Sequence, residues 1–185
     1  MIFVPCTTSL VAYSIIFRSL FANNGLVNYV LVNIGILDKP YNFLTQPFAA
    51  KIVIILALLW RWTGYNMVFY LAGLQNIEYS VYEAAKIDGA NGWKTFWKIT
   101  VPLLKPTIIM TFIMSINGTL QLFDESVNLT KGGPANSTIT MSHYIYNTCF
   151  INVPNFGYAA AMSFIIFIMV AVLAFINLKV GDTRD

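Results

Sequence analysis

The sequence predicts an all-α membrane protein with about four transmembrane helices, and three observations lead to this fold class. Of its 185 residues, 57% are hydrophobic and 10% are charged, and the mean hydropathy is +0.66. This composition excludes an ordinary soluble domain. Several apolar runs approach the length of about 20 residues that a helix needs to cross a bilayer. The longest charged and polar segment, residues 76–102, lies between two such runs, so we expect it to lie in water.

The first predicted span covers residues 2–21. It has no polar leading region and no small-residue cleavage pattern after it, so a signal peptide is not expected. Arg18, near its end, can reach the membrane interface. Residues 22–50 then form a polar loop that Pro and Gly residues interrupt, and residues 26–36 within it can form a short interfacial helix.

The second predicted span, residues 52–74, carries a charge near its middle. Arg61 stands between Trp60 and Trp62, and a charge at that depth is costly unless it faces the protein interior or a water-filled cavity. Two interpretations stay open, namely a residue beside a polar pathway or gate, and a structural ion pair or snorkelling side chain. A stripe of small and polar residues shares one face of this helix and should turn inward: Thr63, Asn66, Tyr70 and Gly73.

The polar segment 76–102 predicts two short helices separated by a glycine turn. Asn76 is expected to cap the first helix. Gly89 ends it, because glycine adopts the left-handed conformation without a steric cost. Asn91 or Gly92 then starts the second helix, and Pro102 suits the first turn of the next one. Four residues of the second helix fall on one face, with Lys94 and Lys98 turned away: Trp93, Phe96, Trp97 and Thr100.

The third predicted span, residues 103–123, has two different faces. The residues of one face are small and suit close helix packing: Thr111, Ser115, Gly118 and Thr119. The roughly opposite face carries Asn117, Gln121 and Asp124. Such polar groups cost free energy if they face lipid. They can hydrogen-bond either a hydroxylated ligand or a neighbouring helix, and both interpretations stay open.

The remainder of the chain is a loop followed by the fourth predicted span. In residues 124–157, Tyr144, Tyr146 and Phe150 indicate a re-entrant or surface helix, although an ordinary aromatic belt gives the same pattern. His143 is interpreted as structural because no nucleophile or carboxylate stands at a telling spacing. The fourth span, residues 158–178, contains no charge.

Cationic residues suggest the orientation of these spans. Four spans place both chain ends and the 76–102 segment on one side, which carries Lys86, Lys94, Lys98, Lys105, Lys179 and Arg184. The other side carries Lys39, Lys51 and Lys131, with Arg18 near its boundary. Because cationic residues concentrate in cytoplasmic loops, the 76–102 segment and both ends are expected in the cytoplasm.

A spaced motif in the polar segment resembles the EAA loop of permease subunits of ABC importers. The motif consists of Glu83-Ala84-Ala85, Gly89 and residues 99–102, where Val101 replaces the usual Leu. Further short matches are similar to the carbohydrate-uptake branch, and in particular to the larger maltose-type permease subunit: residues 62–66, 71–74, 132–134 and 144–146. The resemblance covers essentially all 185 residues. It implies a MetI-like transmembrane domain from which about two preceding helices are missing, so the chain is expected to be N-terminally truncated.

The resemblance also implies a function, which is movement of a mono- or oligosaccharide across a bacterial or archaeal plasma membrane. The expected ATPase-subunit interface consists of Glu83, Ala84, Ala85, Asp88 and Gly89. Glu83 would make a charge-assisted contact there, Ala84 and Ala85 would permit close approach, and Gly89 would supply the bend. The candidate sugar path is formed by Arg61, Gly64, Asn66, Ser115, Asn117 and Gln121.

The expected partners are a second permease subunit, a cytoplasmic ABC ATPase dimer, an extracytoplasmic sugar-binding protein and membrane lipid; no nucleic acid is expected. No cofactor or metal is expected on the chain itself. It contains no phosphate-binding G-x-x-x-x-G-K-[ST] run, so ATP would be bound by the ATPase subunit. Cys6 and Cys149 form neither a disulfide framework nor a metal site.

Three alternatives remain. The polar segment can be an amphipathic helix pair lying on lipid headgroups. A membrane-embedded enzyme would need a catalytic constellation, which the spans do not offer, and no enzyme activity is therefore expected. A structural or non-functional fragment of a permease is the third alternative.

Overall fold

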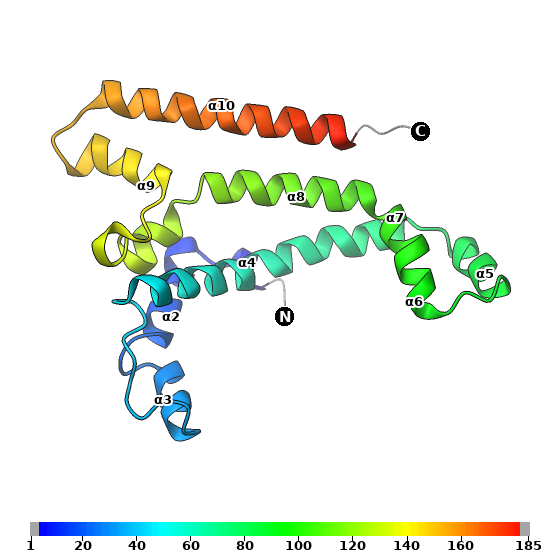
Figure 1. Ribbon diagram of the computed structural model, residues 1–185, viewed down its shortest axis with the longest axis horizontal. Helices are drawn as coiled ribbons and strands as arrows, with labels where there is room; N and C mark the ends of the chain where they lie inside the picture. Colours follow the sequence, from blue (N-terminus) through cyan, green and yellow to red (C-terminus); the bar gives the residue numbers. More distant parts are fainter. Residues whose placement is uncertain (1–3, 182–185) are drawn as a thin grey trace.

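The computed structural model describes residues 4–181, and this part of the chain is built from helices with no β-strand. Three long helices lie roughly side by side: α4 (Pro47–Gln75), α8 (Lys105–Leu120) and α10 (Phe156–Gly181). Figure 1 shows α8 between the other two, and it packs against both of them. The architecture therefore has the all-α character that the composition predicts.

Helices α4 and α10 correspond to the second and fourth predicted spans. Each is long and apolar enough to cross a membrane, although α4 begins earlier than expected, at Pro47. The third predicted span is different. The segments Gly92–Leu103 and Lys105–Leu120 meet the same criterion only together, as a pair bent by 65°. The bend follows Pro102 and precedes Pro106, and both prolines lack the N–H that would continue a helix.

The prediction of one continuous helix over residues 2–21 was wrong within the described residues; residues 2 and 3 lie outside them. The chain forms α1 (Val4–Thr7) and α2 (Leu10–Leu20), separated by Thr8 and Ser9. The Thr8 hydroxyl donates to the carbonyl of Pro5 at 2.8 Å, and Ser9 is extended with φ −57° and ψ 137°. Hydroxyl side chains that bond nearby backbone compete with helix continuation, which accounts for the break.

The hydrophobic core lies where α2, α4 and the π-helical turn η2 (Ser126–Thr130) meet. Its buried members are Tyr13, Phe17, Val53, Ile54, Ala57 and Leu129. Because lipid tails are as apolar as these side chains, their close packing, and not their removal from water, stabilises the contacts. The core thus fixes η2, which belongs to the loop after α8, against the N-terminal half of α4.

The loop between α2 and α4 contains α3 (Leu26–Asn33), which projects from the helical body in Figure 1. Its only buried residue, Asn28, binds the loop together. The Asn28 amide donates to the carbonyls of Ala22 and Tyr41 at 3.0 and 2.9 Å, and it accepts from the Tyr41 N–H at 2.8 Å. The short helix that the sequence predicts over residues 26–36 is therefore present and ends earlier.

The polar segment forms α5 (Tyr79–Ile87), α6 (Gly92–Thr95), the π-helical η1 (Phe96–Thr100) and α7 (Val101–Leu103). Asn76 does not cap α5 as predicted. It is the C-cap of α4, with its N–H bonded to Ala72, because α4 continues to Gln75. Gly89 has φ +71° and provides the expected left-handed turn. The Asn91 side chain accepts from the Lys94 N–H at 2.8 Å, as an N-cap should.

The loop after α8 contains η2, the 3₁₀ turn η3 (Pro134–Asn136), α9 (Met141–Tyr146) and the π-helical η4 (Asn147–Ile151). The surface helix predicted around Tyr144 therefore exists as α9 and η4. His143 is buried and lies 2.7 Å from the Ser126 hydroxyl through Nδ1, and Ser126 also donates to the Thr138 carbonyl at 2.7 Å. These bonds give His143 a structural role, because they join α9 to η2.

Candidate functional site

The two stripes of small and polar residues predicted on the second and third spans face each other in the structure. Tyr70 on α4 and Thr111 on α8 are joined by a hydrogen bond of 2.8 Å between their hydroxyls. A Cβ added at Gly73 would meet Leu104 and Thr107, so the helices approach closely there. Their small residues therefore set the spacing of α4 and α8, as small residues do in membrane helix pairs.

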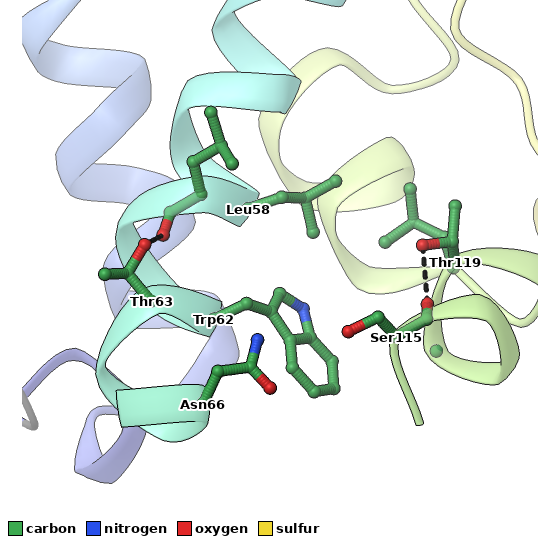
Figure 2. A pocket seen from close by; sticks show the side chains of 9 residues that line it. Leu58, Trp62, Thr63, Asn66, Ser115 and Thr119 are labelled. Atoms are coloured by element: carbon green, nitrogen blue, oxygen red, sulfur yellow. Dashed lines mark hydrogen bonds between the residues drawn. The ribbon is translucent and has the colours of Figure 1, made fainter. Parts of the chain in front are cut away.

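A pocket of about 240 Å³ opens between the same two helices (Figure 2). Nine residues line it: Leu58, Leu59, Trp62, Thr63 and Asn66 from α4, Ser115, Gly118 and Thr119 from α8, and Leu122 just after it. Gly118 is essential to its shape, because a Cβ there would lie 3.0 Å from the Trp62 ring. The volume lies just below the range of about 300–1,000 Å³ usual for small-molecule sites.

The polar groups of the pocket leave hydrogen-bonding capacity for a ligand. The hydroxyls of Thr63, Ser115 and Thr119 donate to carbonyls of their own helices at 2.5–2.8 Å, so their oxygens retain lone pairs. The buried Oδ1 of Asn66 has no hydrogen-bond partner within residues 4–181. A buried amide without a partner costs free energy, and a ligand hydroxyl would relieve that cost. Trp62 adds an aromatic surface beside it (Figure 2).

The structure brings together only two of the six residues predicted to form the sugar path. Asn66 and Ser115 line the pocket from opposite helices. Gly64 is buried outside it, Asn117 is half-buried on another face of α8, and Gln121 is exposed just after that helix. None of these three lines this pocket, and for Asn117 and Gln121 the reason is that the small face of α8, and not its amide face, turns toward α4. Their place in a sugar path stays a prediction. Sequence reasoning missed Trp62 as a lining residue, although it stands one residue from the polar stripe.

Arg61, the remaining predicted path residue, lies outside the pocket and forms an ion pair. Its Nη1 is 3.7 Å from Oε1 of Glu125, and the guanidinium lies 5.4 Å from the centre of the Tyr13 ring. The Tyr13 hydroxyl donates to the same Glu125 oxygen at 2.6 Å. Arg61, Glu125 and Tyr13, here called the charged triad, therefore connect α4, the loop after α8 and α2. The geometry favours the ion-pair interpretation of Arg61.

Sequence reasoning did not identify Glu125, which is only 4% exposed. Its one signal is its position directly after a membrane span. A buried carboxylate needs a cation or several donors, and only the folded structure shows that Arg61 and Tyr13 supply them.

The polar helix α5 presents one of its faces outward. Among the residues predicted to contact an ATPase subunit, Glu83, Ala84, Asp88 and Gly89 are exposed. Ala85 is only 6% exposed, so its predicted role in close approach to a partner does not fit this conformation. The face of α5 that carries Ala85 turns toward η1, where the hydroxyls of Tyr82 and Thr100 lie 3.3 Å apart.

Two apolar residues on α5 were not predicted to contact a partner. Tyr79 is 74% exposed and Ile87 is 86% exposed. They lie four residues before and after Glu83, so the three side chains share a face of the helix. Large apolar side chains exposed together on a polar helix mark a surface for another protein or for the membrane. The signal in the sequence was the four-residue spacing around Glu83.

Two helices long enough to cross a bilayer, a pocket with polar groups between α4 and α8, and a short exposed helix beyond their ends are the features expected of a membrane transporter subunit. Comparison with known protein families shows which one the chain belongs to. Residues 1–181 match the family described as binding-protein-dependent transport system inner membrane component, and the chain belongs to it. The sequence-based identification of a permease subunit is thereby confirmed.

Close relatives are sugar transport permeases. The chain is 59% identical to the lactose transport system permease protein LacF of Rhizobium radiobacter, over 100% of this chain and 62% of that protein. It is 36% identical to the arabinooligosaccharides transport system permease protein AraP of Bacillus subtilis, over 98% of this chain and 58% of the relative. The chain thus spans about three fifths of the length of these curated relatives.

Two solved structures share the fold. A bacterial ABC transporter involved in the import of alginate matches with a TM-score of 0.88 at 24% identity, covering 99% of this chain and 64% of the other. A bacterial alginate ABC transporter in complex with its pentasaccharide-bound periplasmic protein matches with a TM-score of 0.78 at 27% identity, over 98% of this chain and 61% of that one. The prediction of a MetI-like importer fold is confirmed.

Proposed function

We propose that the chain forms the membrane-spanning permease part of an ABC importer that moves a sugar delivered by a binding protein and that a separate ATPase subunit drives the movement. The observation that carries the proposal is that one continuous helix, α4, joins the two candidate sites. Its Trp62, Thr63 and Asn66 line the pocket, and it ends at Gln75, shortly before α5 begins at Tyr79. At about 1.5 Å per residue, Asn66 and Gln75 lie about 14 Å apart along the helix.

The chemistry of the pocket suits one sugar unit. Asn66 and the hydroxyls of Thr63, Ser115 and Thr119 supply hydrogen-bonding groups, and Trp62 supplies an apolar face. The names of the relatives support a sugar as the substrate, and the identity of 59% to a lactose permease protein favours a small oligosaccharide. Because the pocket is open and has only about 240 Å³, we expect a second permease subunit to provide the rest of the path.

The α5 helix is the proposed contact with the ATPase subunit. Its exposed face offers Glu83 for a charge-assisted hydrogen bond, with Tyr79 and Ile87 for apolar contact. In this proposal α5 and the ends of the chain are cytoplasmic, ATP is held by the ATPase, and the permease itself performs no chemistry. Closure of the ATPase dimer would move α5 and, through α4, change access to the pocket. Such coupling requires a part of the permease that has two conformations. Both the ATPase contact at α5 and the sugar in the pocket must shift the equilibrium between them.

Two matched substitutions test the docking role. Glu83→Lys reverses the charge on the proposed contact face, whereas Glu78→Lys reverses an exposed charge at the helix N-cap. We expect the first to abolish ATP-dependent sugar uptake by proteoliposomes that contain the permease, its partners and the binding protein. The second should retain most of the uptake. Unchanged uptake by the Glu83→Lys protein would refute the docking role.

The pocket is tested separately with Asn66→Ala. Loss of the amide should raise the sugar concentration that gives half-maximal uptake by about tenfold, since one hydrogen bond in a buried site contributes about 1–1.5 kcal/mol. Asn117→Ala is the control, because Asn117 does not line the pocket. Equal effects of both substitutions would show that this pocket is not the sugar path.

A further inference from the structure

The second half of the polar segment differs from α5 in its surface. Trp93 and Trp97 are 74% and 51% exposed, and their rings pack edge to face with centroids 5.8 Å apart. Lys94 and Lys98 follow them by one residue each and are also exposed. Trp93 and Trp97 form one row along the helix, and Lys94 and Lys98 form the neighbouring row, about 100° further around the helix axis. The exposed side that carries both rows is here called the Trp–Lys face.

The charge around this face is of a single sign. The chain contains no Asp or Glu from residue 89 to residue 123, whereas Lys94, Lys98 and Lys105 all fall in that interval. Neither Lys94 nor Lys98 takes part in an ion pair in the described part of the chain. The face is therefore complementary to an anionic surface, and tryptophan and lysine are the residues that favour the boundary between lipid and water.

The geometry of the adjoining helix places the Trp–Lys face at that boundary. Helix α8 has 16 residues, about 24 Å at 1.5 Å per residue, which is shorter than a hydrocarbon core of about 30 Å. The apolar region must therefore continue past Lys105 toward α7. The segment Gly92–Leu103 is bent by 65° from α8. Since membrane helices tilt by about 20° on average, this segment lies closer to the membrane plane than to its normal.

The position of α5 leaves this face to the membrane. In Figure 1, α5 lies beyond α6, at the far end of the molecule from α9. A protein that approaches from the water therefore meets α5 first, while the Trp–Lys face stands next to the membrane end of α8. We propose that this face binds anionic lipid headgroups of the leaflet on the α5 side. The inference rests on the membrane orientation in the proposed function and assigns a second surface to the polar segment.

The test measures tryptophan fluorescence of the full chain in nanodiscs of phosphatidylcholine that contain increasing amounts of phosphatidylglycerol. In each sample one of the two lipids is brominated, because bromine quenches nearby tryptophan. Quenching of Trp93 and Trp97 is obtained as the difference between the wild-type chain and the Trp93→Phe/Trp97→Phe chain. Bromine near the headgroup end of the acyl chain should quench more than bromine near the methyl end. At equal lipid content, brominated phosphatidylglycerol should quench the fluorescence of Trp93 and Trp97 more than brominated phosphatidylcholine does. The two lipids can also be compared with the wild-type chain alone.

Removal of the two charges tests the lipid preference. A lysine near an anionic surface contributes roughly fivefold to association, so Lys94→Gln/Lys98→Gln should lower the preference for phosphatidylglycerol at least fivefold, to near one. The control Lys39→Gln/Lys51→Gln removes one lysine from the loop before α4 and one from the start of α4, both on the other side of the proposed orientation, and should leave the preference unchanged.

Three outcomes would overturn the inference. The first is quenching by aqueous iodide with none by brominated lipid, which would place the face in water. The second is an unchanged lipid preference in the Lys94→Gln/Lys98→Gln chain. The third is loss of ATPase binding by that chain with unchanged lipid quenching, which would assign the face to a protein. A lipid preference without any ATPase binding would contradict the proposed function and leave this inference standing.

Discussion

Removal of the Glu125 carboxylate is expected to destabilise the protein by breaking the charged triad. Glu125 accepts from the Tyr13 hydroxyl at 2.6 Å and pairs with Arg61 at 3.7 Å. Its side chain is 6% exposed and that of Arg61 is 23% exposed. In Glu125→Leu, the Arg61 cation would remain in a partly buried position without its partner.

The magnitude follows from the burial of the pair. Removing one partner of a buried ion pair costs about 3–5 kcal/mol of unfolding free energy. The hydrogen bond from Tyr13 to the charged Glu125 contributes about 1.5–3 kcal/mol, but the two contributions do not add, because they share the same carboxylate. Because Arg61 keeps some contact with solvent, we expect the low end, about 3 kcal/mol. The Glu125→Leu/Arg61→Met protein should recover most of this loss, since apolar replacement of a whole buried pair is often neutral.

The assay is a double-mutant cycle, with unfolding followed by circular dichroism in mixed detergent micelles. Wild type, both single variants and the double variant are compared. We expect a coupling energy of about 2 kcal/mol or more between the two positions. Additive effects of the single substitutions, or a negligible loss in Glu125→Leu, would show that the triad does not act as a unit.

Three further predictions concern other contacts. Asn28→Ala removes three hydrogen bonds and should increase amide exchange in residues 22–45 at least tenfold by mass spectrometry, with α10 unchanged as the internal control. Gly118→Leu places a side chain against the Trp62 ring and should reduce sugar uptake at least tenfold while ATPase co-purification persists; normal uptake would exclude the pocket. Burial lowers the pKa of His143 below its usual 6.5, so the fold favours the neutral ring, and stability present above pH 6.5 should fall as the pH drops below it. Replacement of His143 by Gln should reduce this loss of stability at acid pH, measured as the unfolding temperature over a pH series. The same pH dependence in the variant and the wild type would show that His143 does not cause the loss.

Local patterns in the sequence predicted much of the fold. The inward stripes on residues 63–73 and 111–119 do meet each other, because helical periodicity alone decides which residues share a face. The turn at Gly89 was predictable for a similar reason, since a left-handed residue between two helical patterns favours glycine.

Features that depend on distant residues were not predictable. Glu125 lies far along the chain from Arg61, and nothing local shows that they pair. The break at Ser9 reflects a competition between side-chain and backbone hydrogen bonds that hydropathy does not measure. Likewise, the burial of Ala85 depends on how η1 folds back on α5, so the motif alone could not separate its outward residues from its inward ones.

The exposed face of α5 is proposed to bind an ATPase subunit, and co-purification tests this contact. The chain is co-expressed with a cognate ABC ATPase subunit and isolated in detergent as wild type, Ile87→Gln or Ile36→Gln. Ile87 is 86% exposed on α5, and Ile36 is 66% exposed just after α3, so the second substitution is a matched control. We expect wild type and Ile36→Gln to retain the ATPase and Ile87→Gln to lose most of it. Equal recovery with all three chains, or none with a folded wild-type chain, would contradict it.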